Sequence, residues 1–377
     1  MIRHACWLLT ILTMPLSATE WTFVVPRVTD ATLNGIYFMD NYGWAVGDDG
    51  TTLKSNNGGA SWYTLPAPPE CDTFDLETVF FSDSLRGWIC GEGGMLFKTE
   101  DGGGNWEKLP RRTNKQLTHL SFFDNTGWIT DSDRLLLTTD YGHTWLDIIV
   151  DLSYIFGTSF VSKQTAWLYG YDEKIAITTD GGVHWRYLPT PSRPQAISAS
   201  DDTTCWVALS NYPSIPTIAF TRNAGETWTQ ADLIDTGATA VNDEHWHVKD
   251  MHMSSSTKGW VLAEYYSQGN YLFTTDDGGE SWHEETDFPT IIDEIDKIHA
   301  DRDGNIWLVG QFGMIITNRD LSTRILSKNR SPLSFSPRGT AMKGFYDLRG
   351  RRIPQAQGHS ISLRVDTRGS RLHFVHR

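Results

Sequence analysis

Short apolar runs alternate with turn-forming residues along most of this chain, and the runs recur at a nearly constant spacing. Each run holds one tryptophan between small or apolar residues, as in GWAVG, GWICG, AWLYG and GWVLA. The seven tryptophans are Trp44, Trp88, Trp128, Trp167, Trp206, Trp260 and Trp307, separated by 44, 40, 39, 39, 54 and 47 residues. Because no helical apolar period of useful length occurs in this region, the pattern predicts an all-β fold of short strands.

An octapeptide of the form Ser/Thr-x-Asp/Asn-x-Gly-x-x-Trp follows six of these runs. Its third residue can accept hydrogen bonds from backbone N–H groups ahead of it, its Gly supplies a left-handed conformation, and its Trp buries apolar area. We therefore interpret the octapeptides as structural turns. Their key residues are Asn57, Asp101, Asp140, Asp180, Asn223 and Asp277, with Trp62, Trp106, Trp145, Trp185, Trp228 and Trp282.

A repeat of this length with four short strands is typical of a propeller blade. The sequence thus predicts a seven-bladed β-propeller over residues 19–327. Six octapeptides for seven runs leave the last blade without an outer strand. The N-terminal segment WTFVVP resembles the outer strands of other blades, so we predict that it completes blade 7 and closes the ring. The alternative is that residues 324–326 take this place.

The two ends of the chain differ from the repeat region. Residues 1–18 have the basic, apolar and small-residue order of a secretory signal peptide, which predicts no transmembrane segment after cleavage. A Ser/Pro-rich linker at 328–340 precedes a predicted small C-terminal β module at 341–377. Residues 1–323 carry 20 Lys+Arg and 44 Asp+Glu, whereas residues 324–377 carry 12 and 2. The acidic body argues against a nucleic-acid partner.

Three cysteines remain after signal cleavage. An oxidising compartment would allow a Cys71–Cys90 disulfide, which would leave Cys205 as a buried free thiol.

Candidate binding residues gather in two places. The connections between second and third strands carry carboxylates in five of seven blades, which predicts an acidic rim at one face of the ring. The alternative is that these charges only keep the ring soluble. The rim residues are Asp48, Asp49, Glu92, Asp131, Asp133, Asp172, Glu173 and Glu264, joined by the aromatic Trp246.

The second place is the insertion before blade 6, at residues 232–250. His245 and His247 lie two apart and would share one face of a strand, so with Asp250 they are candidate metal ligands. Exposed loop histidines flanking a packing Trp246 are the competing interpretation. The sequence indicates no cofactor.

The octapeptides are similar to the Asp-box, or BNR, repeat. Together with the GWAVG-type strands, they resemble the propeller of photosystem II stability/assembly factor-like proteins over about residues 20–326. That resemblance implies a ring that serves as a protein-binding platform. The tail resembles the C-terminal sorting domain of type IX secretion cargo. The residues that carry this resemblance are Tyr346-Asp347-Leu348, Gly350-Arg351-Arg352-Ile353, Gly358 and the basic segment 371–377.

Sialidases also carry Asp-boxes, but a sialidase would have an early Phe/Tyr-Arg-Ile-Pro segment and three arginines that bind a carboxylate. Neither the early segment nor a plausible set of arginines appears here, and Arg352-Ile353-Pro354 lies in the tail. We therefore expect a non-catalytic, monomeric scaffold that binds a protein partner. Carbohydrate binding and a sialidase-like glycoside hydrolase are the alternatives. We expect the protein to be secreted or held at the cell surface, after passage through the periplasm and outer membrane of a Gram-negative bacterium.

Overall fold

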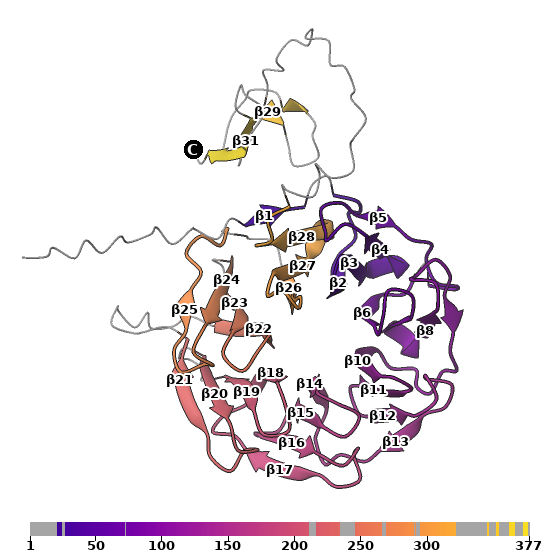
Figure 1. The fold of residues 1–377 in the computed structure, drawn as a ribbon, viewed down its shortest axis with the longest axis vertical. Helices are drawn as coiled ribbons and strands as arrows, with labels where there is room; N and C mark the ends of the chain where they lie inside the picture. The colour runs from indigo at the N-terminus through magenta and orange to yellow at the C-terminus, as the bar shows by residue number, and fades with distance from the viewer. Residues whose placement is uncertain are drawn as a thin grey trace, which may run out of the picture.

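The chain forms a ring of seven four-stranded antiparallel sheets (Figure 1). The first strands of the seven sheets line a central channel. This computed structural model confirms the predicted all-β, seven-bladed propeller. It describes residues 21–24, 27–71, 73–210, 216–233, 246–265, 269–289, 291 and 295–321, together with four short C-terminal strands.

The strands follow one another from the channel outward in blades 1 to 6. Blade 1 contains β2 (Leu33–Met39), β3 (Tyr42–Gly47), β4 (Thr52–Ser55) and β5 (Tyr63–Thr64). Blade 2 contains β6 (Leu76–Phe81), β7 (Gly87–Gly91), β8 (Leu96–Thr99) and β9 (Glu107–Lys108). Blade 3 contains β10 (Leu117–Phe123), β11 (Thr126–Asp131), β12 (Leu135–Thr138) and β13 (Leu146–Ile148). Blade 4 contains β14 (Ile155–Phe160), β15 (Ala166–Gly170), β16 (Lys174–Thr178) and β17 (Arg186–Pro189).

The remaining blades repeat this order. Blade 5 contains β18 (Pro194–Ala199), β19 (Cys205–Leu209), β20 (Thr217–Thr221) and β21 (Thr229–Asp232). Blade 6 contains β22 (Trp246–Met253), β23 (Gly259–Tyr265), β24 (Gly269–Thr275) and β25 (His283–Glu284). Blade 7 contains β26 (Ile295–Ala300), β27 (Ile306–Gly310), β28 (Met314–Thr317) and β1 (Thr22–Phe23). Single 3-10 turns, η1 (Asp48–Gly50), η2 (Glu92–Gly94) and η3 (Gln311–Gly313), join second to third strands in blades 1, 2 and 7.

The N-terminal strand completes blade 7, as the sequence predicted. β1 pairs antiparallel with β28, with Thr22 opposite Thr317 and Phe23 opposite Ile316. The backbone N–H of Val24 extends this ladder to the carbonyl of Ile315 at 2.9 Å. Residues 324–326, the alternative outer strand, lie outside the described residues. The ring is therefore closed by pairing its two ends.

The hydrophobic core lies between neighbouring blades. The seven second-strand tryptophans are all essentially buried. Trp44 stacks on Phe81 of the next blade with ring centroids 3.7 Å apart, and Trp88 stacks on Phe122 at 3.8 Å. Because burial of such rings gives the largest apolar contribution per residue, these blade-to-blade stacks stabilise the ring as a whole.

The octapeptides form the turns between third and outer strands. We call the face that carries these turns and the first-to-second-strand turns the lower face. The Asp140 carboxylate accepts the Thr144 N–H at 2.8 Å and the Thr138 hydroxyl at 2.7 Å. Thr138 in turn accepts the N–H of Gly142, which has a φ of +91° that a Cβ would disfavour. Matching Asp or Asn bonds to the N–H four residues ahead occur at Asn57, Asp101, Asp180, Asn223 and Asp277.

Blade 7 lacks the octapeptide and turns this corner with a buried ion pair. Arg319 donates to Asp301 at 3.1 Å, and both side chains are buried. The same carboxylate accepts the Trp307 indole N–H at 3.4 Å.

The three described cysteines are buried, and the Cys71–Cys90 disulfide that the sequence allowed is not formed. Cys71 packs between blades 1 and 2 and Cys90 between blades 2 and 3, which separates the two sulfurs. Burial raises the pKa of the Cys90 and Cys205 thiols.

The C-terminal segment forms its own sheet in the order β30-β29-β31-β32. Its strands are β29 (Phe345–Tyr346), β30 (Arg352–Ile353), β31 (Ser362–Val365) and β32 (Leu372–Val375). The predicted signal peptide at 1–18 and the linker at 328–340 lie outside the described residues. Within the part of the chain that is described, no helix has the length and apolar character to cross a bilayer.

Candidate functional site

A polar channel runs through the ring and is lined by the first strand of every blade. Its cavity has a volume of about 400 Å³. We call the face at which chain segments join the blades, and second strands join third strands, the upper face. The channel-lining side chains used below are Glu77, His119, Ser159, Ser198, Asp250, His252 and Lys297.

Part of the channel's polarity holds neighbouring blades together. First strands leave an edge of backbone N–H groups towards the channel, and side chains of adjacent blades accept from this edge. The bonds are Ala199 N–H to Ser159 Oγ (2.9 Å), Met253 N–H to Ser198 Oγ (3.0 Å), Ile298 N–H to Asp250 Oδ2 (3.1 Å) and Phe38 N–H to His299 Nε2 (3.1 Å). These groups therefore have a structural role.

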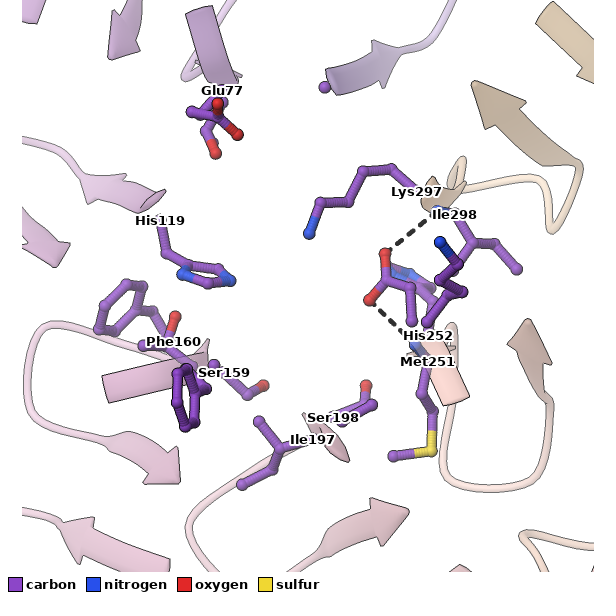
Figure 2. Close-up of a pocket in the computed structure, with 18 of the residues that line it drawn as sticks. Glu77, His119, Ser159, Phe160, Ile197, Ser198, Met251, His252, Lys297 and Ile298 are labelled. Carbon is purple, nitrogen blue, oxygen red and sulfur yellow. Dashed lines mark hydrogen bonds between the residues drawn. The ribbon is translucent and has the colours of Figure 1, made fainter. Parts of the chain in front are cut away.

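Three titratable groups face one another in the cavity. Figure 2 shows Lys297 extending its ammonium towards the side of the channel that carries His119 and Glu77. Burial lowers the pKa of His119 to about 3, with Lys297 adding to the effect. Burial also lowers the pKa of His299 to about 3. Burial raises the pKa of Glu77, while Gln116 and Lys297 oppose that shift.

The upper end of the channel is formed by one extra residue in each first strand. All seven first strands contain a β-bulge near their start. Bulges re-aim a side chain and interrupt pairing. The bulged residues, which we call the bulge ring, are Asn34, Glu77, Thr118, Phe156, Gln195, Lys249 and Asp296. Equivalent positions thus carry seven different residues.

The sequence contained a signal for the bulge ring that strand alternation alone misses. In six blades the first strand contains a buried residue, two further residues and another buried residue, as in Leu76-Glu77-Thr78-Val79 and Ile295-Asp296-Lys297-Ile298. In blade 4 the last of these places is Thr158, which is only partly buried. In a regular strand, residues that face the core lie an even number of positions apart, so two core residues three positions apart break the alternation. The repeated break in period marks the bulge.

The predicted acidic rim is continuous only over blades 1 and 2. Asp49 is exposed on η1, and its backbone N–H donates to the Asp75 carboxylate at 3.1 Å. Burial raises the pKa of Asp75, and the charges of Asp48, Glu92 and Asp49 raise it further. These four carboxylates, which we call the acidic cluster, therefore lie close enough to repel one another.

The other predicted rim residues are engaged differently. Asp131 is buried and its carboxylate accepts the N–H groups of Asp133 and Arg134 at 2.8 Å each, so it is not a rim residue. Its position directly before a tight turn made it look like a loop-tip carboxylate. The remaining contacts are Asp133 with Lys115, Asp172 with the Ser153 N–H (2.6 Å), and Glu264 with Lys249 (3.4 Å), while Glu173 is exposed.

The candidate metal ligands do not converge within the described residues. His245 lies outside them. His247 pairs with Gln195 at 3.2 Å, and Asp250 accepts the N–H groups of Met251 and Ile298. No group of three possible ligand side chains gathers in the described part of the chain. Trp246 is half-buried against Tyr265, with ring centroids 4.6 Å apart.

An exposed group of aromatic rings on blade 4, next to the start of blade 5, was absent from the predicted site. Tyr154, Phe156 and Tyr171 lie on the upper face beside Arg193, and we call these four residues the aromatic cluster. Phe156 belongs to the bulge ring and lines the cavity. Tyr154 and Tyr171 sit in connections, where no periodic signal distinguishes a binding ring from an ordinary loop residue.

The ring and its lower-face turns make this chain a seven-bladed β-propeller with a repeated Asp or Asn turn, and comparisons show its similarity to photosystem II assembly factors. The family model described as "Photosynthesis system II assembly factor YCF48" matches residues 14–115. The photosystem II assembly lipoprotein Ycf48 of Synechococcus sp. (strain CC9902) is 25% identical over 211 residues, which is 53% of this chain and 57% of that protein. The chain thus matches little more than half the length of this curated relative.

Solved structures agree on the fold. YCF48 from Cyanidioschyzon merolae matches with a TM-score of 0.65 and 19% identity, covering 79% of this chain and 98% of that one. YCF48 bound to D1 peptide matches with a TM-score of 0.65 and 18% identity, covering 80% and 97%. The GH74 xyloglucanase from Xanthomonas campestris matches with a TM-score of 0.61 and 11% identity, covering 78% and 53%.

Proposed function

We propose that this propeller is a non-catalytic scaffold that binds a protein partner on its upper face. The observation that carries the proposal is the bulge ring, where one structural position holds seven different side chains around the channel mouth. A surface that is regular in backbone and individual in side chains suits recognition of one specific partner. The similarity to assembly factors, one of them solved with a bound peptide, supports the same class of function.

The carboxylates of the channel favour a scaffold over a glycosidase. Retaining and inverting glycosidases need two carboxyl groups that face each other across the scissile bond. Among the lining residues, Asp250 uses both carboxylate oxygens to accept backbone N–H groups, so it is committed to structure. Glu77 is the other carboxylate that lines the cavity, and it faces Lys297 and His119 (Figure 2). Neither of these two side chains can act as the second carboxylate that a glycosidase needs.

Carbohydrate binding is the second candidate, because exposed rings at a channel mouth can stack on sugars. Tyr154, Phe156 and Tyr171 are the rings concerned. A sugar ligand would use these faces without needing the neighbouring guanidinium of Arg193.

We further propose that the chain acts at the cell envelope. The signal-like residues 1–18 and the basic tail at 341–377 support export. Cell fractionation with mass spectrometry of the mature N-terminus tests this location. A cytoplasmic protein with an intact N-terminus would contradict it.

Site-specific photo-crosslinking in cells tests the scaffold function. A photoreactive amino acid is placed at Tyr171 on the upper face, or at Val183 on the lower face of the same blade, and both positions are well exposed. We expect one discrete protein adduct from position 171 and none from position 183. Equal adducts from both positions, or recovery of polysaccharide only, would contradict a protein-binding upper face.

A further inference from the structure

The aromatic cluster brings three exposed rings and one guanidinium together on the upper face. The Arg193 guanidinium lies 4.1 Å from the Tyr171 ring centroid and 5.3 Å from that of Phe156. The Phe156 ring lies 6.3 Å from both Tyr154 and Tyr171. The exposed fractions of Tyr154, Phe156 and Tyr171 are 56%, 43% and 58%. Contiguous exposed aromatic surface of this kind marks interaction sites, whereas scattered apolar residues do not.

The backbone at Tyr154 adopts a conformation that opposes this exposure. Tyr154 has a φ of +61°. Among described residues that directly precede a first strand, it alone is left-handed. The left-handed backbone conformation is unfavourable for every residue other than glycine, by on the order of 1 kcal/mol. Since the ring stays exposed, burial of the ring does not offset this cost. A conformation maintained in this way is a sign of functional constraint.

Arg193 also differs from the other cations that lie over aromatic rings. Five such cations have a second partner, which satisfies their charge or N–H groups. These are Lys54 with the Gly102 carbonyl (2.7 Å), Lys98 with Glu100 (2.8 Å), Lys174 with Asp151 (3.1 Å), Arg222 with Glu280 (2.9 Å) and Lys258 with Asp276 (3.2 Å). Within the described part of the chain, the Arg193 guanidinium has ring contacts but neither an ion pair nor a hydrogen bond.

We propose that the aromatic cluster binds an extended peptide segment of the partner that carries a carboxylate beside a large apolar side chain. This proposal rests on the scaffold function and assigns its site. The rings cover one face of the guanidinium and leave its N–H edge for a planar carboxylate, the group that Arg recognises best. Arg, Tyr and other aromatic residues are also the side chains that dominate binding energy at protein interfaces. A neutral sugar would satisfy the rings and leave the guanidinium unpaired.

The negative charge of the acidic cluster, on the opposite side of the channel mouth, determines the orientation in which this peptide binds. In a ring of seven, blade 1 lies opposite blades 4 and 5 (Figure 1). The acidic cluster of blades 1 and 2 therefore faces the aromatic cluster across the channel. A carboxylate is repelled from the first and attracted to the second, so the acidic end of the segment binds at Arg193.

Peptide selection on the intact full-length protein tests this inference. The probe is a phage-displayed library of random decapeptides. We expect the selected peptides to pair Asp or Glu with Phe, Tyr, Trp or Leu. In fluorescence anisotropy, Arg193→Ala should weaken the best selected peptide at least ten-fold, and Tyr171→Ser should weaken it similarly.

Two matched variants serve as controls. Arg222→Ala removes another guanidinium that lies over a ring, 4.6 Å from Phe220, but on the lower face of blade 5. It should leave peptide affinity within two-fold of wild type. Asp49→Asn keeps a residue that tolerates a φ of +53° and removes one acidic-cluster charge. It should leave the affinity unchanged or strengthen it.

The possible failures separate this inference from the scaffold function. Unchanged affinity in Arg193→Ala, selected peptides without acidic residues, or no selected peptide at all would overturn the aromatic-cluster site. Binding of neutral oligosaccharides on a glycan array that Arg193→Ala leaves intact would also overturn it and favour the carbohydrate alternative. A protein adduct from the photoreactive residue at position 171 would still stand as support for the scaffold in each of these cases.

Discussion

The lower and upper faces of the ring are built by the same strands but differ in how far their residues repeat. On the lower face, six blades use the same Asp or Asn to hold the same turn, with the same hydrogen bond to the N–H four residues ahead. On the upper face, seven equivalent bulges carry seven different side chains. Repetition therefore marks the residues that hold the ring, whereas the residues that differ at equivalent positions are the ones on which the proposed recognition depends.

The comparison predicts that changes in the residues that hold the ring together lower its stability. Removal of β1, the strand that closes the ring, should have the largest effect. Deleting residues 20–26 removes β1 and its pairing with β28. It also removes Trp21, which packs edge-on against Phe288 with ring centroids 5.1 Å apart. We expect the melting temperature to fall by on the order of 10 °C, as the loss of several kcal/mol implies. A synthetic peptide of residues 19–26 should restore part of it by mass action. An unchanged melting temperature would falsify the closure.

Blade 7 offers the next test, because a buried ion pair replaces the repeated turn there. Arg319→Ala leaves the Asp301 carboxylate buried without its cation. We expect a loss of about 3–5 kcal/mol in the free energy of unfolding, measured by urea denaturation. The exposed pair of Arg222 and Glu280 is the control, and Arg222→Ala should cost under about 1 kcal/mol. Similar losses in both variants would mean that Arg319 has no special role.

The channel, which lies between the two faces, should make stability depend on pH. His119 and His299 have folded pKa values of about 3, below the usual 6.5, because burial disfavours their charged forms. The unfolded chain then binds more protons below pH 6.5, so stability is fully present above that pH and is lost as the pH falls towards 3. The maximal slope is about 1.4 kcal/mol per pH unit for each histidine. Glu77, whose pKa burial raises, acts in the opposite direction.

Urea denaturation at pH 7, 5.5 and 4 measures this slope. The slope between pH 7 and 5.5 reports the histidines. The octapeptide carboxylates, such as Asp140 with a pKa of about 2, begin to lose their contribution only as the pH approaches their usual pKa of 3.8. His119→Gln should reduce the slope, because it removes one of the two strongly shifted histidines. A slope that the substitution leaves unchanged would show that His119 does not contribute.

The smallest effects should separate the two faces most directly. Asp140→Ala removes the hydrogen bonds to Thr144 and Thr138 and should cost about 1–2 kcal/mol of stability. It should leave binding of the selected peptide unchanged. Arg193→Ala should do the reverse, with a melting temperature like that of wild type and weakened binding. A loss of peptide affinity in Asp140→Ala at normal stability would instead place a binding site on the lower face.

The repeated parts of the molecule could be predicted from the sequence, because the residues that form each strand or turn lie close together in the chain. The spacing of Trp44, Trp88 and the other second-strand tryptophans predicted the blades, and the missing seventh octapeptide predicted the role of β1. The upper face could be predicted only in part. Asp131 looked like an exposed loop carboxylate, but its side chain turns back to hold its own turn. Tyr154, Tyr171 and Arg193 are distant in sequence, and only the fold brings them together.

The pairing of β1 with β28 also has a consequence for the order of events during synthesis. Within the ring, Thr22 leaves the ribosome before every other strand residue, and its partner Thr317 is the last strand residue to do so. At roughly 5–20 residues per second, the first strand waits on the order of 15–60 s for its place to exist. Blades 1 to 6 are each complete from their own sequence, whereas blade 7 requires both ends of the ring. Ring closure is thus the last step of folding and requires that all blades have been synthesised. A chain cut short before β28 leaves β1 without its partner.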